Sequence, residues 1–146
     1  MREMEIDSLS AEIRELYFMA RDVSQRAYAP YSNFRVGAAL LTGLGGIFCG
    51  VNVESASYGL TCCAEKSAIV AAVTTEGPKM RIQQVAVHVT GEVAVPCGAC
   101  RQMIAEFGTD VRIVFSARDR VVDSNLAELL PLHFVAPDQD GDIDAC

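Results

Sequence analysis

Several features are missing from this sequence: it has no tryptophan, no long apolar run and no glycine-rich phosphate loop of the Walker type. A membrane-spanning helix needs about 18 or more apolar residues in a row, so a transmembrane protein is not expected. Without the phosphate loop, a small uncharged ligand fits the chain better than a phosphorylated one. The lack of tryptophan counts against a thioredoxin-type protein, although Cys97 and Cys100 form a Cys-x-x-Cys pair.

Positive charge is also scarce. Lysine and arginine total 12 against 19 aspartates and glutamates, for a net charge of −7. An acidic surface repels phosphate backbones, so a polynucleotide is not an expected partner. The first residues, Met1 to Glu5, are acidic and lack the apolar stretch of a secretory signal. We therefore expect a cytoplasmic protein that acts on a small uncharged molecule and has no membrane partner.

The hydrophobic pattern predicts one α/β domain over residues 1–146, without repeats or linkers. Apolar side chains at helical spacing predict a helix over 11–27, with Ser10 as its N-cap and Pro30 beyond its end. The other expected elements are a hairpin of 36–41 and 47–53, helices at 63–73, 97–107 and 126–130, and strands at 85–89 and 111–115. This order predicts a three-layer α/β/α sandwich with a central mixed sheet. We expect the acidic tail at about 138–146 to be disordered.

Two cysteine segments point to chemistry: Cys63-Ala64-Glu65 and Pro96-Cys97-Gly98-Ala99-Cys100. Three thiolates can hold one zinc ion and leave its fourth position open, as catalytic rather than structural sites do. Each segment lies where a loop is expected to become a helix, and the partial positive charge of a helix N-terminus favours thiolate. A ligand followed by x-Glu, and later by Pro-Cys-x-x-Cys, is typical of zinc-dependent nucleobase deaminases.

Three further side chains are candidates for roles beside such a zinc site, two from its charge and one from its need for proton transfer. Three thiolates and one zinc ion sum to about −1, which weakens the metal as a Lewis acid unless cations lie nearby. Lys66 and Arg101 directly follow ligands in the sequence and are the candidate cations. Glu65 is the candidate for moving protons between water and the leaving group. The alternative interpretation of Lys66 is a solvated lysine on a helix surface.

Two other classes of protein remain open from the residues alone. One has a closed structural zinc site with a fourth thiol from Cys62 or Cys49, and the other is a dithiol redox protein. Neither explains the carboxylate of Glu65 beside the first thiol. We expect His88 to be a core or edge side chain of a strand, and Cys49 and Cys146 to have no role in the site.

With these residues in view, the chain resembles the small cytidine deaminases of pyrimidine salvage, in the cytidine and deoxycytidylate deaminase family. The resemblance runs from about residue 27 to 134. The matching stretches, in order, are Tyr28 to Leu40, Gly50 to Glu54, Ala56 to Tyr58, Cys63 to Glu65, Pro96 to Gln102 and Glu128 to Pro131. The resemblance implies that cytidine and 2′-deoxycytidine are hydrolysed to the uridine products with release of ammonia. It also implies one zinc ion per subunit and a homotetramer whose subunits share active sites.

The same resemblance implies a role for each matching residue. Zinc would be bound by Cys63, Cys97 and Cys100, with Glu65 as the proton shuttle that also faces the pyrimidine ring nitrogen. The backbone at Ala64 would orient the ring, and the ring of Phe34 would lie against it. The ribose hydroxyls would bind Asn52 and Glu54, which strand alternation places on one face. The site of a neighbouring subunit would be reached by Ala56, Tyr58 and Phe134.

Three positions depart from the family pattern. Lys66 stands where the family usually has arginine, which can donate to two thiolates at once. Ser55 stands where asparagine is usual, and Val135-Ala136-Pro137 replaces a shorter Gly-Pro after Phe134. These departures touch no expected zinc ligand.

Within the family, the rival function is deamination of another aminopyrimidine nucleoside such as blasticidin S. Deoxycytidylate deaminases fit less well, because they carry histidine at the position of Cys63. The acidic balance disfavours editing of polynucleotides. From a different class, a non-catalytic zinc module remains an alternative.

Overall fold

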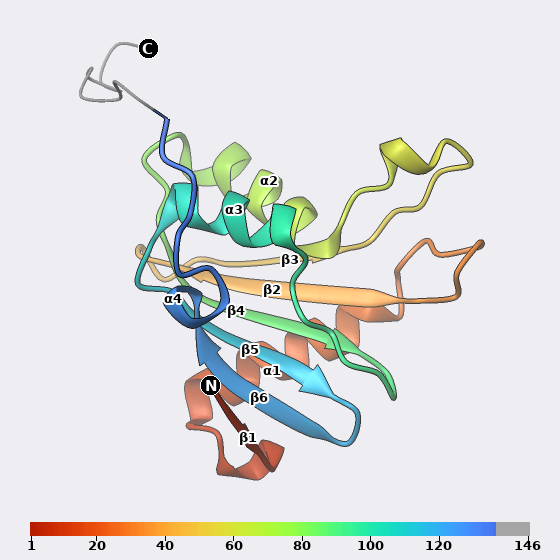
Figure 1. The fold of residues 1–146 in the computed structure, drawn as a ribbon, viewed down its shortest axis with the longest axis horizontal. Helices are drawn as coiled ribbons and strands as arrows, with labels where there is room; N and C mark the ends of the chain where they lie inside the picture. Colours follow the sequence, from red (N-terminus) through yellow and green to blue (C-terminus); the bar gives the residue numbers. More distant parts are fainter. Residues whose placement is uncertain (137–146) are drawn as a thin grey trace.

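The computed structural model describes residues 1–136 (Figure 1). The predicted disordered tail, Cys146 and Pro137 lie outside the described residues. Within them, one central sheet is covered by helices on both faces. No helix of residues 1–136 is long and apolar enough to cross a membrane.

The sheet has six strands in the order β1-β6-β5-β4-β2-β3. Their bounds are β1 Arg2–Met4, β2 Val36–Thr42, β3 Ile47–Val51, β4 Ile82–Val89, β5 Arg112–Ala117 and β6 Arg120–Asn125. The β4–β5 pair is parallel, and the other neighbouring strands are antiparallel. The sheet is therefore mixed, as the sequence predicts.

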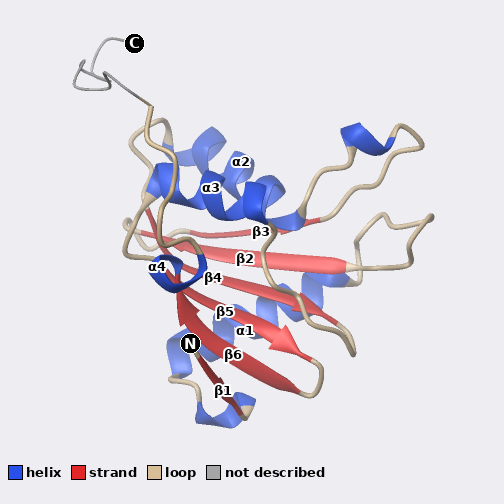
Figure 2. Ribbon diagram, in the orientation of Figure 1, coloured by secondary structure: helices blue, strands red, loops and turns tan. Residues whose placement is uncertain are grey.

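The helices form the two outer layers. One face of the sheet carries α1, Ala11–Ser24, and the other carries α2, Ala64–Glu76, and α3, Gly98–Phe107, with the short α4, Leu126–Leu129, beside them (Figure 2). Two 3-10 turns, η1 at Ile6–Ser8 and η2 at Tyr58–Leu60, complete the elements of the described chain. The predicted three-layer sandwich is confirmed.

Strand alternation divides the interior into two cores. On β2, Ala38 and Leu40 belong to the core under α2 and α3, whereas Ala39 faces the core under α1. Because successive apolar side chains of β2 point to opposite faces of the sheet, helices pack on both faces of this strand. The centre of the sheet is therefore buried from both sides.

A close backbone contact fixes where α2 begins. A Cβ atom at Gly50 on β3 would lie 2.4 Å from both the carbonyl oxygen of Ala64 and the amide nitrogen of Ala68. The first turn of α2 thus rests directly on the backbone of β3. Because Cys63 is the N-cap of α2, this contact also fixes the position of Cys63 relative to β3.

The sequence analysis did not predict strands β1 and β6. The β5–β6 hairpin turns through Arg118 and Asp119, with Arg118 at φ 61°, so it lacks the glycine or asparagine that usually marks such a turn. Across the pair, Arg112 and Asp123 form a bidentate ion pair with distances of 2.9 and 2.7 Å. A strand held partly by charge gives a weak apolar signal. The three residues of β1 form an edge that pairs with β6.

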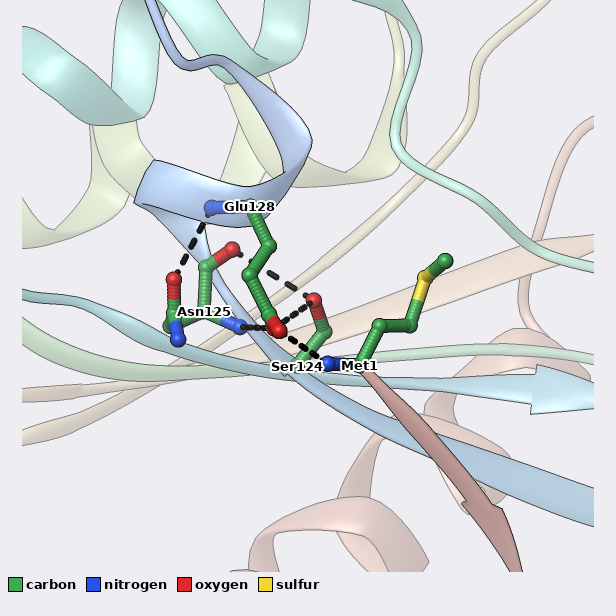
Figure 3. Close-up of polar contacts among 4 residues, drawn as sticks. All are labelled: Met1, Ser124, Asn125 and Glu128. Carbon is green, nitrogen blue, oxygen red and sulfur yellow. Dashed lines mark hydrogen bonds and ion pairs between the residues drawn. The ribbon is translucent and has the colours of Figure 1, made fainter.

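The link from β6 into α4 is built from polar contacts (Figure 3). The Asn125 side chain accepts a hydrogen bond from the Glu128 N–H at 2.9 Å, and the Glu128 carboxylate accepts one from the Asn125 N–H at 3.2 Å. This is a reciprocal capping box. The same carboxylate accepts hydrogen bonds from the Ser124 hydroxyl and from the Met1 ammonium group. These contacts fix the start of α4.

Candidate functional site

Three cysteines meet where two helices begin. Cys63 is the N-cap of α2 and Cys97 is the N-cap of α3, while Cys100 lies in the first turn of α3 and is fully buried. The Sγ atoms of Cys63 and Cys97 are 4.0 Å apart, and all three sulfurs lie within 4.8 Å of one another. The two helix ends therefore converge on one point, as the sequence predicts.

The pKa values of Cys63 and Cys100 are shifted in opposite directions. A hydrogen bond from the Cys100 thiol is the main cause that lowers the pKa of Cys63 to about 6, with further help from Cys97 and the charge of Lys66 and against the effect of burial. The same contact raises the pKa of Cys100, whose proton is the one shared. Of the Cys63 and Cys100 pair, Cys63 therefore forms the thiolate more readily.

The cluster has the dimensions of a zinc site. Tetrahedral Zn–S bonds of about 2.3 Å place sulfurs about 3.8 Å apart, close to the separation of Cys63 and Cys97. Among residues 1–136 no fourth cysteine, histidine or carboxylate joins the cluster. Cys62 Sγ instead lies 3.6 Å from the Ser67 hydroxyl, and Cys49 packs with the core on the α1 face. A three-ligand site fits these residues better than a closed four-thiol site.

Glu65 lies beside the thiols, one residue into α2. Its side chain is only 5% exposed. Burial is the main cause that raises the pKa of its carboxyl group, and the Cys63 thiolate adds to the shift while Lys66 opposes it. Lys66 itself is half-buried and acts on both groups by its charge. A buried carboxyl group with a raised pKa next to a metal-binding cluster is suited to proton transfer.

A cavity of about 400 Å³ opens over this group, within the range of small-molecule sites. Its wall includes seven of the predicted site residues: Phe34, Asn52, Glu54, Cys63, Ala64, Glu65 and Cys97. Most of the other lining side chains are small and apolar. The cavity therefore offers apolar walls, two carboxyl groups and thiols to a ligand.

The structure places Asn52 and Glu54 on the cavity wall, where both also support the neighbouring 31–36 segment. The Asn52 amide donates to the Phe34 carbonyl and accepts from the Val36 N–H, both at 2.8 Å. The Glu54 carboxylate accepts from the Tyr31 N–H at 2.8 Å. Hydrogen bonding to these donors, first of all to the Ser32 hydroxyl, lowers the pKa of Glu54.

Arg101, the second candidate cation, is held by main-chain carbonyls. Its Nε donates to the Pro96 carbonyl at 2.7 Å and its Nη1 donates to the Leu129 carbonyl at 2.8 Å. These bonds tie the loop before Cys97 to the end of α4. Its effect on a zinc cluster stays a prediction.

The three residues expected to serve a neighbouring subunit lie outside the cavity wall. Ala56 and Tyr58 belong to the 52–62 segment, drawn in yellow, which extends away from the sheet between β3 and α2 and is exposed at 56–61 (Figure 1). Tyr58 is 79% exposed and Phe134 is 69% exposed. The structure of one chain thus leaves these aromatic rings facing outward.

The sequence analysis missed several lining residues. Ser32, Thr61 and the apolar 93–95 segment also form the wall. The 93–95 segment directly precedes Pro96 and Cys97, so its approach to the site could have been read from the motif. His88, in contrast, lies in the α1-side core as expected, where its Nδ1 and the Tyr17 hydroxyl are 2.8 Å apart.

With this geometry described, comparison with known proteins identifies the family. Residues 10–117 match the family model described as the cytidine and deoxycytidylate deaminase zinc-binding region. The chain belongs to this family. Its three-cysteine cluster fits the zinc-binding character of the family.

Individual deaminases agree with that result. A cytidine deaminase of Halalkalibacterium halodurans is 42% identical over 114 residues, which are 77% of this chain and 86% of that protein. The crystal structure of a cytidine deaminase from Burkholderia pseudomallei superposes with a TM-score of 0.74 at 39% identity, covering 86% of this chain and all of that one. A blasticidin-S deaminase of Bacillus cereus is 30% identical over 139 residues, which are 90% of this chain and 98% of that protein.

Proposed function

We propose that this deaminase hydrolyses cytidine and 2′-deoxycytidine to uridine and 2′-deoxyuridine, with release of ammonia. The observation that carries the proposal is the buried carboxyl group of Glu65 beside the three thiols, at the wall of a cavity of about 400 Å³. The names of the relatives support cytidine as the substrate. We propose that the reaction serves pyrimidine salvage and takes place in the cytoplasm.

In this proposal the side chains of Cys63, Cys97 and Cys100 hold zinc. Bound there, zinc supplies the activation of a water molecule at neutral pH. The Glu65 carboxylate accepts the two protons of the water molecule in turn, and delivers one to the pyrimidine ring nitrogen and the other to the departing amino group. Burial raises its pKa, so it holds such a proton more readily than an exposed glutamate would.

The cavity wall orients the nucleoside. Phe34 offers an aromatic face for the flat pyrimidine, and the backbone at Ala64, at the start of α2, orients the ring. The Asn52 amide donates to or accepts from the ribose hydroxyls, and the Glu54 carboxylate accepts from them, with the capacity that their loop contacts leave free. Lys66, and to a lesser extent Arg101, offset the negative charge of the thiolates.

We further propose a homotetramer in which Ala56, Tyr58 and Phe134 of one subunit complete the site of another. The support is exposure: Tyr58, Leu60 and Phe134 are 79, 74 and 69% exposed in one chain. Exposed large apolar side chains support an interface at these positions. A partner subunit would cover them and close the open side of the cavity.

A parallel assay tests the proposal. Purified protein is mixed with cytidine, 2′-deoxycytidine and blasticidin S, and the change in ultraviolet absorbance of each is followed with and without a zinc chelator. We expect turnover of both nucleosides, lost with the chelator. Turnover of blasticidin S alone would favour the function of the Bacillus cereus relative. No turnover of any of the three would contradict deamination.

A further inference from the structure

Ser32 occupies a polar junction of the cavity wall that no assigned role explains. Its hydroxyl accepts a hydrogen bond from the Phe34 N–H at 2.9 Å and donates one to Glu54 Oε1. A serine hydroxyl has one proton to donate, and the Phe34 N–H can only donate. The direction of the chain is therefore fixed, from Phe34 through Ser32 to the carboxylate.

The carboxylate of Glu54 is held by three donors of the same turn. The Tyr31 and Ser32 N–H groups donate to Oε2 at 2.8 and 3.3 Å, and the Ser32 hydroxyl donates to Oε1. A carboxylate has about four acceptor positions, so capacity remains on Oε1 for one more donor. This oxygen, which only the Ser32 hydroxyl orients, is the one left to receive a ligand hydroxyl.

The turn that carries Ser32 is itself anchored. The Asn52 amide donates to the Phe34 carbonyl and accepts from the Val36 N–H. Ser32 and Asn52 thus hold the two main-chain polar groups of Phe34 from opposite sides. The hydroxyl of Ser32 is consequently fixed in place before a ligand arrives, and such preorganisation lowers the entropic cost of binding.

We propose that Ser32 is a positioning residue for sugar recognition, which aims Glu54 Oε1 at a ribose hydroxyl. This inference rests on the proposed function, because it takes a nucleoside as the ligand and Glu54 as a ribose contact. Ser32 acts through Glu54 and takes no part in the chemical step at Glu65. Its loss weakens binding of substrates that carry ribose hydroxyls and leaves kcat nearly unchanged.

The test compares two substrates in the same protein preparations. Cytidine has 2′ and 3′ hydroxyls, and 2′,3′-dideoxycytidine has neither. We expect Ser32→Ala to raise KM for cytidine by about 3- to 10-fold, the range for a charge-assisted hydrogen bond at a partly exposed site. The effect on KM for dideoxycytidine should be clearly smaller. Ser32→Thr, which keeps the hydroxyl, is the conservative variant and should restore the discrimination.

Glu54→Gln and the double variant complete the cycle. If Ser32 acts through Glu54, Ser32→Ala adds little to the cytidine KM of Glu54→Gln. Equal effects of Ser32→Ala on both substrates, or full additivity with Glu54→Gln, would overturn the role of Ser32. If Glu54→Gln itself fails to distinguish the two substrates, the ribose contact of the proposed function is wrong and the inference falls with it.

A measurement without substrate provides a second readout. Hydrogen bonding from the Ser32 hydroxyl is the main cause that lowers the pKa of Glu54. A carbon-13 NMR titration of the Glu54 carboxyl group should show that pKa rising toward its ordinary value in Ser32→Ala and staying low in Ser32→Thr. An unchanged pKa in Ser32→Ala would mean that the hydroxyl does not hold the carboxylate.

Discussion

The side-chain amide of Gln102 brackets the main chain of Phe134. Its Nε2 donates to the Phe134 carbonyl at 2.8 Å, and its Oε1 accepts from the Phe134 N–H at 2.9 Å. Gln102 lies on α3, two residues after the buried Cys100. The exposed Phe134 ring is thus carried by the helix that supplies two of the three thiols, although 32 residues separate the pair.

This contact leads to a prediction for the shared site. Phe134→Ala should raise KM by about 3- to 30-fold with a smaller change in kcat, because an aromatic contact with the nucleoside is lost. Gln102→Ala should raise KM less, since the ring remains but its backbone is released. Steady-state kinetics checks both, with Gln83→Ala as a control at an exposed glutamine of β4. A fully active monomer by light scattering would refute the sharing of sites between subunits.

Metal content should depend on three cysteines and not on their neighbours. We expect about one zinc ion per chain, and loss of metal and stability on changing Cys63, Cys97 or Cys100 to serine, because metal binding energy is partly folding energy. Cys62→Ser and Cys49→Ser are the matched controls and should keep the metal. Elemental analysis checks this. Zinc lost in Cys62→Ser but kept in Cys63→Ser would show that Cys62, and not Cys63, is the ligand.

Glu65→Gln should separate binding from chemistry. The amide fills the same buried space but cannot accept a proton, so the fold and the zinc content should persist while kcat falls. A loss of about 10²- to 10⁴-fold is typical of general acid–base catalysis. Single-turnover kinetics and metal analysis of one preparation measure both properties. Near-normal turnover would exclude Glu65 as the proton shuttle.

Lys66 tests how the negative cluster is balanced. Its charge helps to lower the pKa of Cys63, so Lys66→Gln should make the site more negative. Water at the zinc site should then ionise less readily, and kcat should fall with metal still bound. Lys66→Arg should keep or increase activity, because a guanidinium can donate to two sulfurs. Lys79→Gln, at an exposed position, is the charge-matched control. Equal pH–rate profiles for the lysine, glutamine and arginine forms at position 66 would leave Arg101 and the two helix ends as the groups that balance the charge.

The buried His88 predicts a pH dependence of stability. Burial is the main cause that lowers its pKa in the folded protein, and Arg21 adds to the shift. The unfolded chain therefore binds a proton first as the pH falls, so stability is full above about pH 6.5 and declines below it. Urea unfolding of wild type and His88→Asn at pH 5.5 and 7.5 measures this. The His88→Asn variant should lose less stability than wild type between pH 7.5 and pH 5.5. An equal loss would contradict the role of His88 in this pH dependence.

Much of the fold follows from local sequence signals. Helix α1 begins after Ser10 as predicted, and the ligand-bearing helices begin at the residues after Cys63 and Cys97. Periodicity, caps and turn residues specify these elements because the interactions are local. Strand β6 escaped prediction because its support is distant in sequence or ionic: the Arg112–Asp123 pair and the edge strand β1.

The candidate site also has a part that could be predicted from the sequence and a part that could not. The thiols and Glu65 lie on two compact motifs, so their meeting could be predicted from the motifs and the family resemblance. The bonds of Asn52 and Glu54 to the 31–36 segment could not, because they join side chains to main-chain groups some 16 to 23 residues away. Such contacts depend on the path of a loop, which apolar patterning does not encode.

The absence of a side chain at Gly50 has a consequence for engineering of substrate scope. Because the first turn of α2 rests on that bare backbone, any added carbon would lift the helix and move Cys63, Ala64 and Glu65 together. Room for a bulkier base therefore cannot be gained by altering the support beneath α2 without misaligning the reactive groups. Space is better sought at the exposed part of the cavity wall, where the short apolar side chains of Val93 and Val95 can be shortened one at a time.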